Sequence, residues 1–284
     1  MLSRKYDYAV DTSIFDKKNL EILEYIRERA YFLFNNYYSY DYFDNDYCIN
    51  ICKSFIHDFF NGKYDYNFEK FLDSSVPCDI NDEDLDCDGM VWGSYSNKKV
   101  YDIELPEMIS FSDCSVVIHE FIHNLFFSLS PKSCYRKDEE EIITILMEKI
   151  FAAYCYKKDF FKNNDIIDEK LEECLLINIT QYEESFLECI DKDIDELLDS
   201  IFDIDNSMSH ISHFIGEIYS ERLFELYLQN EKKFTNQING LFSGYKVADL
   251  LTYYDVDLQD EKTIDSVVKT IERIERRNID EEDL

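Results

Sequence analysis

Hydrophobic positions along the 284-residue chain recur mostly with the 3.6-residue period of an α-helix. This period predicts helices at residues 17–38, 47–60, 112–129, 142–153, 207–229 and 263–277, and two more between residues 166 and 203, broken near 191–193. Residues 90–95 and 100–105 read instead as two short strands, separated by Ser96-Asn97-Lys98-Lys99 and ending at Pro106, which predicts a β-hairpin. Gly240, Gly244 and the acidic stretch 255–260 predict a loop. We therefore expect a mainly α fold with a small β-hairpin or sheet.

The segment His119-Glu120-Phe121-Ile122-His123 lies inside the predicted helix 112–129. Because positions i and i+4 share one helical face, both imidazoles can reach a single Zn²⁺, and Glu120 is turned towards the side where a bound water would sit. Zinc lowers the pKa of such a water towards about 7, and the glutamate can accept its proton. Ser112 as the N-cap, an acid in the first turn and Pro131 after the last turn are typical of a buried helix.

A core helix with two hydrogen-bonded histidines is the competing interpretation of this segment. It accounts for one histidine more easily than for the His-Glu-His triplet. We therefore predict a metal site with His119 and His123 as ligands and Glu120 as the general base.

A third ligand is expected downstream, because the pattern HExxHxxGxxH is broken by Phe126 and Leu129. The acidic run 138–141 opens the next helix, where some acids simply complement the helix dipole. Glu141 and Glu148 lie about 10 Å apart along a helix axis, so both cannot bind one ion. We predict Glu141 as the third ligand, with Glu140 and Glu148 as alternatives.

These two helices resemble the thimet oligopeptidase and oligoendopeptidase F family of zinc metallopeptidases. In that family D-V-x-T-L-x-H-E-x-x-H is followed by E-x-x-S-x-x-x-E, and residues 113–123 and 141–148 match both in spacing, with Thr144 in place of serine. The resemblance implies a zincin-like metallopeptidase fold, a single Zn²⁺, and Glu141 completing its site. It covers residues 113–153 and 205–224, whereas members of the family are much longer chains.

A third block, residues 213–221, resembles the family segment Y-Y-G-Y-L-W-S-E, in which tyrosines supply hydrogen bonds to the transition state. Phe214 and Glu217 stand where those tyrosines would be. His210 and His213 share a helical face with this region, so we predict one of them as the replacement donor. Solvent-facing helix histidines, or a separate HxxH metal site, are the alternatives.

The charge and the cysteines limit the partners and the compartment. A net charge of −32 repels phosphate backbones and anionic lipid, so we expect a peptide substrate, no nucleic acid and no membrane surface. The chain starts with basic residues that no apolar stretch follows, and none of its segments is long enough to span a bilayer. Nine irregularly spaced cysteines favour reduced thiols and a cytoplasmic location.

Asp84, Asp86 and Asp88 precede Gly89 in the DxDxDG pattern that opens a calcium loop. Position twelve of that loop is Tyr95 rather than glutamate, so a solvated acidic loop is favoured over a Ca²⁺ site.

The predicted function is zinc-dependent hydrolysis of short or unfolded peptides, with the hairpin as an edge to which substrate could add as a strand. A plain structural hairpin is equally compatible. We expect one mostly helical catalytic domain over residues 1–284, divisible into a helical subdomain over residues 1–75, a zincin core over 76–230 and a helical segment over 231–284. The alternatives are a regulatory zincin that cuts one dedicated protein partner and a non-catalytic interaction protein that retains the fold.

Overall fold

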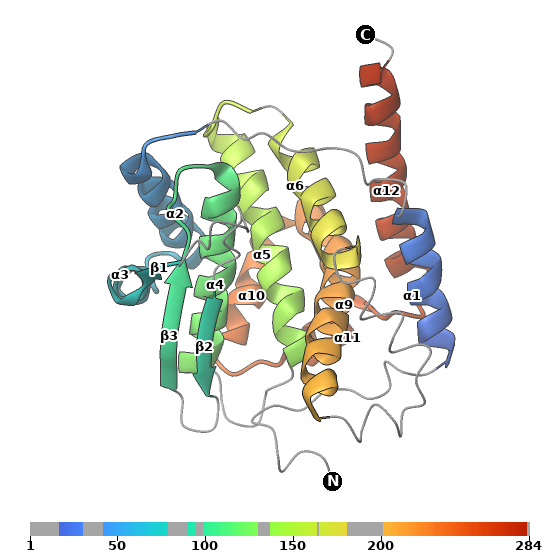
Figure 1. Cartoon of the computed structure of the whole chain (residues 1–284), viewed down its shortest axis with the longest axis horizontal. Helices are drawn as coiled ribbons and strands as arrows, with labels where there is room; N and C mark the ends of the chain where they lie inside the picture. The colour runs from blue at the N-terminus through green and yellow to red at the C-terminus, as the bar shows by residue number, and fades with distance from the viewer. Residues whose placement is uncertain are drawn as a thin grey trace.

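A computed structural model of the chain describes residues 17–30, 42–78, 90–94, 99–129, 137–163, 165–180 and 201–282 (Figure 1). In chain order the elements are α1 (Lys17–Ala30), α2 (Asn45–Phe60), α3 (Asp65–Ser74), β1 (Val76–Pro77), β2 (Met90–Ser94), β3 (Lys99–Leu105), α4 (Phe111–Leu129), α5 (Lys137–Lys158), α6 (Ile166–Leu175), the π-helical turn η4 (Leu176–Thr180), α9 (Ile201–Gln229), α10 (Glu231–Leu241), α11 (Val247–Tyr254) and α12 (Glu261–Glu282). The fold is mainly helical with one small sheet, as the periodicity predicts.

The sheet has the strand order β1-β3-β2. β2 and β3 form the predicted antiparallel hairpin, with Met90 opposite Glu104 and a register shift between Trp92 and Gly93. β1 adds a short parallel pairing to β3 that the sequence pattern did not predict. Helix α4 packs beside β2 and β3, so the His-Glu-His segment lies next to the sheet (Figure 1).

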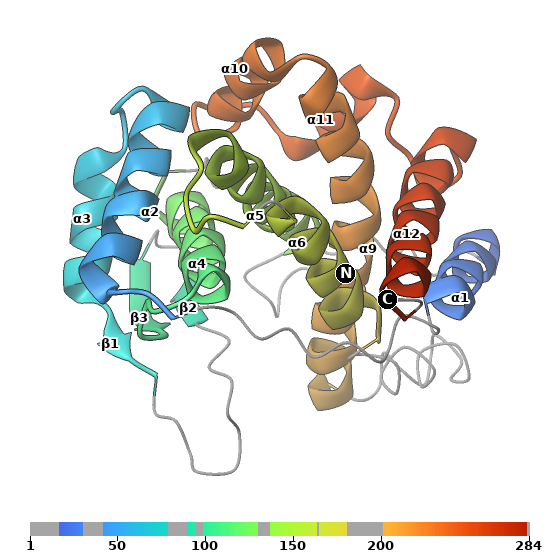
Figure 2. The same ribbon diagram turned by 90° about the horizontal axis from the view of Figure 1, so that it is seen from above.

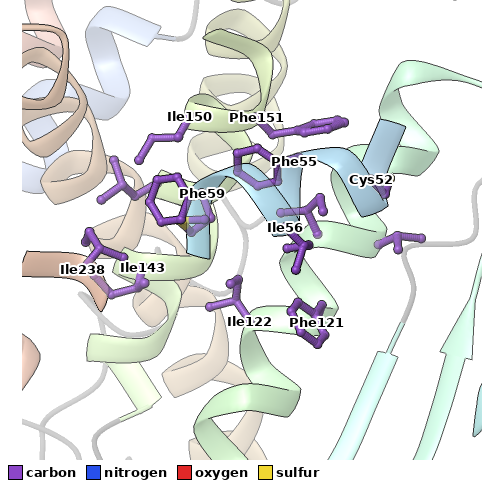
Figure 3. Packing of buried hydrophobic residues seen from close by; sticks show 14 of the residues in the cluster. Cys52, Phe55, Ile56, Phe59, Phe121, Ile122, Ile143, Ile150, Phe151 and Ile238 are labelled. Carbon is purple, nitrogen blue, oxygen red and sulfur yellow. The ribbon is translucent and has the colours of Figure 1, made fainter. Parts of the chain in front are cut away.

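Two clusters of buried apolar side chains hold the helices together. The larger one joins the sheet to α2, α3, α4, α5, α6, α9, α10 and α11, and includes Phe55, Phe121 and Phe151, shown in Figure 3. The smaller one joins α1, η4, α9 and α12 through residues such as Ile26, Ile218 and Ile271. In Figure 2, α1 and α12 lie side by side at the end of the molecule opposite α2 and α3. Helix α5 runs between these two ends and packs against both α4 and α9.

The start of α4 is fixed by a reciprocal capping contact. The Asp113 carboxylate accepts hydrogen bonds from the backbone N–H groups of Ile109 and Ser110, and the Ser110 hydroxyl accepts one from the Asp113 N–H. The helix therefore begins at Phe111, and Ser112, expected as the N-cap, lies inside its first turn.

Three features of the structure correct the predictions made from sequence. The loop expected around 240–260 contains the end of α10 and the whole of α11, and neither α3 nor α10 was predicted. Helix α12 is longer at both ends than 263–277. Cys78 is disulfide-bonded, contrary to the expectation of reduced thiols throughout, whereas the other cysteines in the described ranges are free: Cys48, Cys52, Cys114, Cys155 and Cys174.

Some predictions fall on residues that the structure does not describe. They include Asp84, Asp86 and Asp88 of the possible calcium loop, and residues 31–38 of the first predicted helix. Among the described residues, no helix has the length and apolar character needed to cross a membrane.

Candidate metal centre

Three predicted ligands converge where α4 and α5 face each other. His119 Nε2 and His123 Nε2 lie 3.1 Å apart, and each lies 3.5 Å from Glu141 Oε2. The Glu141 side chain is only 3% exposed, while the two histidine side chains are 14% and 13% exposed. Glu141 therefore lies on the buried side of the cluster, and the histidines lie on the side that solvent can reach.

The far nitrogen of each histidine contacts a carboxylate. His119 Nδ1 lies 2.7 Å from Glu148 Oε1, and His123 Nδ1 lies 3.3 Å from Glu140 Oε2. A carboxylate can only accept, so each Nδ1 donates a hydrogen to it, and each Nε2 can offer a lone pair to a metal ion once it has lost its own hydrogen. Glu140 and Glu148, the alternative ligands, thus lie behind the histidines, an arrangement typical of groups that orient metal-bound imidazoles.

This donor set fits a tetrahedral zinc ion. Ligand atoms about 2.1 Å from such an ion lie roughly 3.3–3.4 Å from one another, close to the three distances of 3.1, 3.5 and 3.5 Å. The two Nε2 atoms are only 3.1 Å apart, so their lone pairs would repel unless a proton or a metal ion lies between them. Among the described residues, His119, His123 and Glu141 form the one group of this kind that could hold a metal ion.

The electrostatics of the cluster favour a bound cation. Burial opposes the ionised form of Glu141, but His213 and His123 outweigh it and hold the pKa of this carboxyl well below its usual range. Burial likewise opposes the charged form of His119, while its hydrogen bonds with Glu141 and Glu148 raise its pKa to about 9. The cluster therefore stabilises positive charge at the point where the three ligand atoms meet.

Glu120, the predicted general base, is 7% exposed. Burial raises the pKa of its carboxyl, and the nearby His119 and His123, followed by a hydrogen bond from the backbone of Val91, partly offset this effect. Val91 belongs to β2, so this carboxylate links α4 to the edge strand of the sheet. A glutamate with a raised pKa is a better proton acceptor than an exposed one.

Helix α9 brings His213 to the same cluster. Its Nε2 lies 3.5 Å from Glu141 Oε2, and its ring is nearly parallel to that of His119, with the ring centroids 6.5 Å apart. Gly216 allows this approach, because a Cβ atom there would lie 3.0 Å from the Glu141 backbone carbon. His210 lies in α9 as predicted, but its side chain is not among those that the structure describes.

The two residues at the expected tyrosine positions turn away from the cluster. Phe214 is buried in the smaller apolar core, and Glu217 is paired with Lys149 at 2.8 Å. The same Lys149 ammonium contacts Glu221 at 2.7 Å and Ser220 at 2.9 Å. This buried network ties α9 to α5 one to two turns beyond His213.

Sequence reasoning missed two buried lysines, Lys149 and Lys170, which are 0% and 2% exposed. Lys170 comes from α6 and contacts Glu148 Oε2 at 2.6 Å, directly behind His119. The available signal was a charged residue inside an apolar helical run, since Lys149 is followed by Ile-Phe-Ala-Ala. A buried lysine requires a carboxylate partner, which predicts such a pair without identifying it.

Fold and site together define a mainly helical protein with a His-His-Glu cluster of metal-ligand type beside a small sheet. No model of a known protein family and no curated protein matches the chain. Two solved structures share its fold. One, assigned as an oligoendopeptidase F from Bacillus anthracis str. Ames, superposes with a TM-score of 0.54 at 14% identity, over 95% of this chain and 56% of that one.

The other is also assigned as an oligoendopeptidase F, with a TM-score of 0.56 at 12% identity, over 89% of this chain and 55% of that one. The chain thus spans just over half the length of either structure. The chain thus shares the mainly helical fold of these two structures, which agrees with the fold expected from the sequence.

Proposed function

We propose that this protein is a zinc-dependent peptidase that hydrolyses short or unfolded peptides, with His119, His123 and Glu141 as the zinc ligands. The observation that carries the proposal is the convergence of these three ligand atoms, each 3.1–3.5 Å from the next, in a fold shared with oligoendopeptidase F structures. In this proposal the three ligands belong to the zincin core expected over residues 76–230 of a single domain. When bound in such a site, zinc supplies Lewis-acid activation of water and of a carbonyl group near neutral pH.

Glu120 acts as the general base in this proposal and then returns the proton to the leaving amine. Its burial supports this role, because the raised pKa increases its affinity for a proton at the moment of attack. The carboxylate also accepts a hydrogen bond from Val91 in the edge strand β2. A peptide added to that edge as an extra strand would run past Glu120.

His213 is the donor that replaces the family's tyrosines in this proposal. Its side chain is 20% exposed and borders Glu141, so a substrate beside the cluster could reach it. A donor aimed at the developing oxyanion contributes about 3–4 kcal/mol in enzymes where it has been removed. His210, three residues earlier in α9, is the alternative donor.

The test is cleavage of a mixture of unrelated quenched-fluorescent peptides by zinc-loaded protein. The wild type should cleave, a strong chelator should stop it, and Glu120→Gln should keep the zinc while losing at least about 10²-fold in rate. His213→Ala should lower kcat with little change in zinc content. Cleavage unchanged in Glu120→Gln would refute the mechanism.

Two alternatives predict zinc without cleavage of such a mixture. A regulatory zincin would cut only its dedicated protein partner, and a non-catalytic interaction protein would cut nothing. The second draws support from Phe214 and Glu217, which turn away from the cluster at the tyrosine positions. Against it stands Glu120, whose buried carboxyl has no use in a purely structural zinc site.

A further inference from the structure

A closed ring of polar contacts behind His119 joins α4, α5 and α6. Glu148 Oε1 accepts the His119 Nδ1 hydrogen at 2.7 Å, while Glu148 Oε2 contacts Lys170 Nζ at 2.6 Å. Lys170 Nζ also donates to Glu173 Oε2 at 3.2 Å. Glu173 Oε1 accepts the Ser112 hydroxyl at 2.6 Å, which returns the ring to α4 seven residues before His119.

A buried hydroxyl group also contacts the Glu148 oxygen that Lys170 holds. Ser115 Oγ donates to Glu148 Oε2 at 3.0 Å, and Ser115 is fully buried. Glu148 Oε2 is therefore held by one ammonium and one hydroxyl, which leaves Oε1 oriented towards His119. The corresponding contact behind His123, to Glu140, is longer at 3.3 Å.

We propose that Lys170 is a positioning residue for the metal centre, which strengthens zinc binding by anchoring Glu148 behind His119. The proposal rests on the proposed function in one respect, namely that His119 is a zinc ligand. Without the ammonium, the Glu148 carboxylate loses its charged anchor and can rotate away from the imidazole. Partners behind a metal-bound histidine fix its ring, and their loss typically weakens metal affinity about 10–100-fold.

The second buried lysine provides a matched control. Lys149 is fully buried like Lys170 and also contacts two glutamates, Glu217 and Glu221, at 2.8 and 2.7 Å. The further contacts of these glutamates run to Asn178 and Thr270, away from the zinc ligands. Damage to either lysine network should therefore cost comparable stability, whereas only the Lys170 network leads to His119.

The experiment measures the zinc dissociation constant by chelator competition, well below the unfolding temperature of each variant. Lys170→Met/Glu173→Gln removes one positive and one negative charge, so the net charge of the buried group is unchanged. Lys149→Met/Glu221→Gln does the same in the control network. The first variant should bind zinc about 10–100-fold more weakly than the wild type, and the second should match the wild type. Equal affinities in all three proteins, or equal weakening in both variants, would overturn the proposal.

A double-mutant cycle tests whether Lys170 acts through Glu148. Adding Lys170→Met/Glu173→Gln to Glu148→Gln should weaken zinc binding little beyond Glu148→Gln alone, because the anchored carboxylate is already gone. Fully additive losses would overturn the proposed route. If the lysine variant does not fold, Ser115→Ala can replace it, because this substitution removes a weaker contact to Glu148 Oε2. An unchanged zinc affinity of Ser115→Ala would count against the proposal. A wild type that binds no zinc would instead refute the proposed function.

Discussion

Replacing Gly216 by alanine tests the contact that places α9 against Glu141. A Cβ at this position would lie 2.8 Å from Ile145 Cδ1 and 3.0 Å from both the carbonyl carbon and the Cβ of Glu141. Carbon atoms pack at about 3.5–4.0 Å, so the two helices would have to separate by roughly 0.5–1 Å. The Ile145 methyl can move aside, but the Glu141 atoms move only with α5 itself.

Two opposing terms set the change in unfolding free energy. Alanine is favoured over glycine inside a helix by about 0.8–1.0 kcal/mol, whereas overpacking costs about 1–3 kcal/mol. The net effect of Gly216→Ala is therefore a loss of up to about 2 kcal/mol. The rate of peptide cleavage should fall more strongly than the stability, because a misplacement of about 1 Å can reduce an enzymatic rate by about 10²-fold.

Gly240→Ala is the matched control, since it is a second helical glycine whose added Cβ also meets a neighbour. That neighbour is the Tyr245 ring, which is 67% exposed and can swing into solvent. Urea unfolding should show Gly216→Ala less stable than Gly240→Ala by about 1–3 kcal/mol. Gly216→Ala should also lose peptide cleavage while Gly240→Ala retains it. Equal stability and equal cleavage in the two variants would refute the close approach of α9 to Glu141.

Three further predictions concern stability. Lys149→Met should lower the unfolding free energy by about 3–5 kcal/mol in denaturant titrations, because it leaves Glu217 buried without its cation; a loss below about 1 kcal/mol would contradict this. The hydrogen bond to Asp65 raises the pKa of His57, so this pair should stabilise the protein below about pH 6.5 and lose its effect as pH rises through the raised pKa. NMR titration should show a lower His57 pKa in Asp65→Asn, and an unchanged value would exclude the pair. Asp113→Ala should cost about 1–2 kcal/mol by thermal unfolding, since it removes the cap of α4, and an unaltered Tm would argue against that cap.

The elements of the fold that have a clear local sequence pattern were predictable. The spacing of His119 and His123 placed both on one face of a helix, and alternation in residues 90–105 located the hairpin beside it. Helix α11 was missed because its eight residues are too few to establish a period and lie between Gly244 and Asp255, which both indicate turns. Short helices depend on packing partners that a linear pattern does not identify.

The choice among the three glutamates of α5 shows where sequence reasoning ends. Helical geometry excluded Glu141 and Glu148 as joint ligands, but the rotation of α5 against α4 decides which carboxylate faces the histidines. That rotation depends on side chains far away in sequence, such as Gly216, which lets α9 press on Glu141. The contact of Lys170 with Glu148 likewise joins two helices whose relative placement has no local signal.

The most direct test of the metal centre is zinc stoichiometry after equilibrium dialysis of the wild type, Glu141→Gln and Glu140→Gln at one fixed free-zinc concentration. These glutamates are neighbours in sequence and both buried, so the two substitutions are closely matched. The wild type should hold about one zinc per chain, Glu141→Gln should lose it, and Glu140→Gln should retain a weaker site. A wild type without zinc, or Glu141→Gln with a full complement, would contradict the assignment of His119, His123 and Glu141 as its ligands.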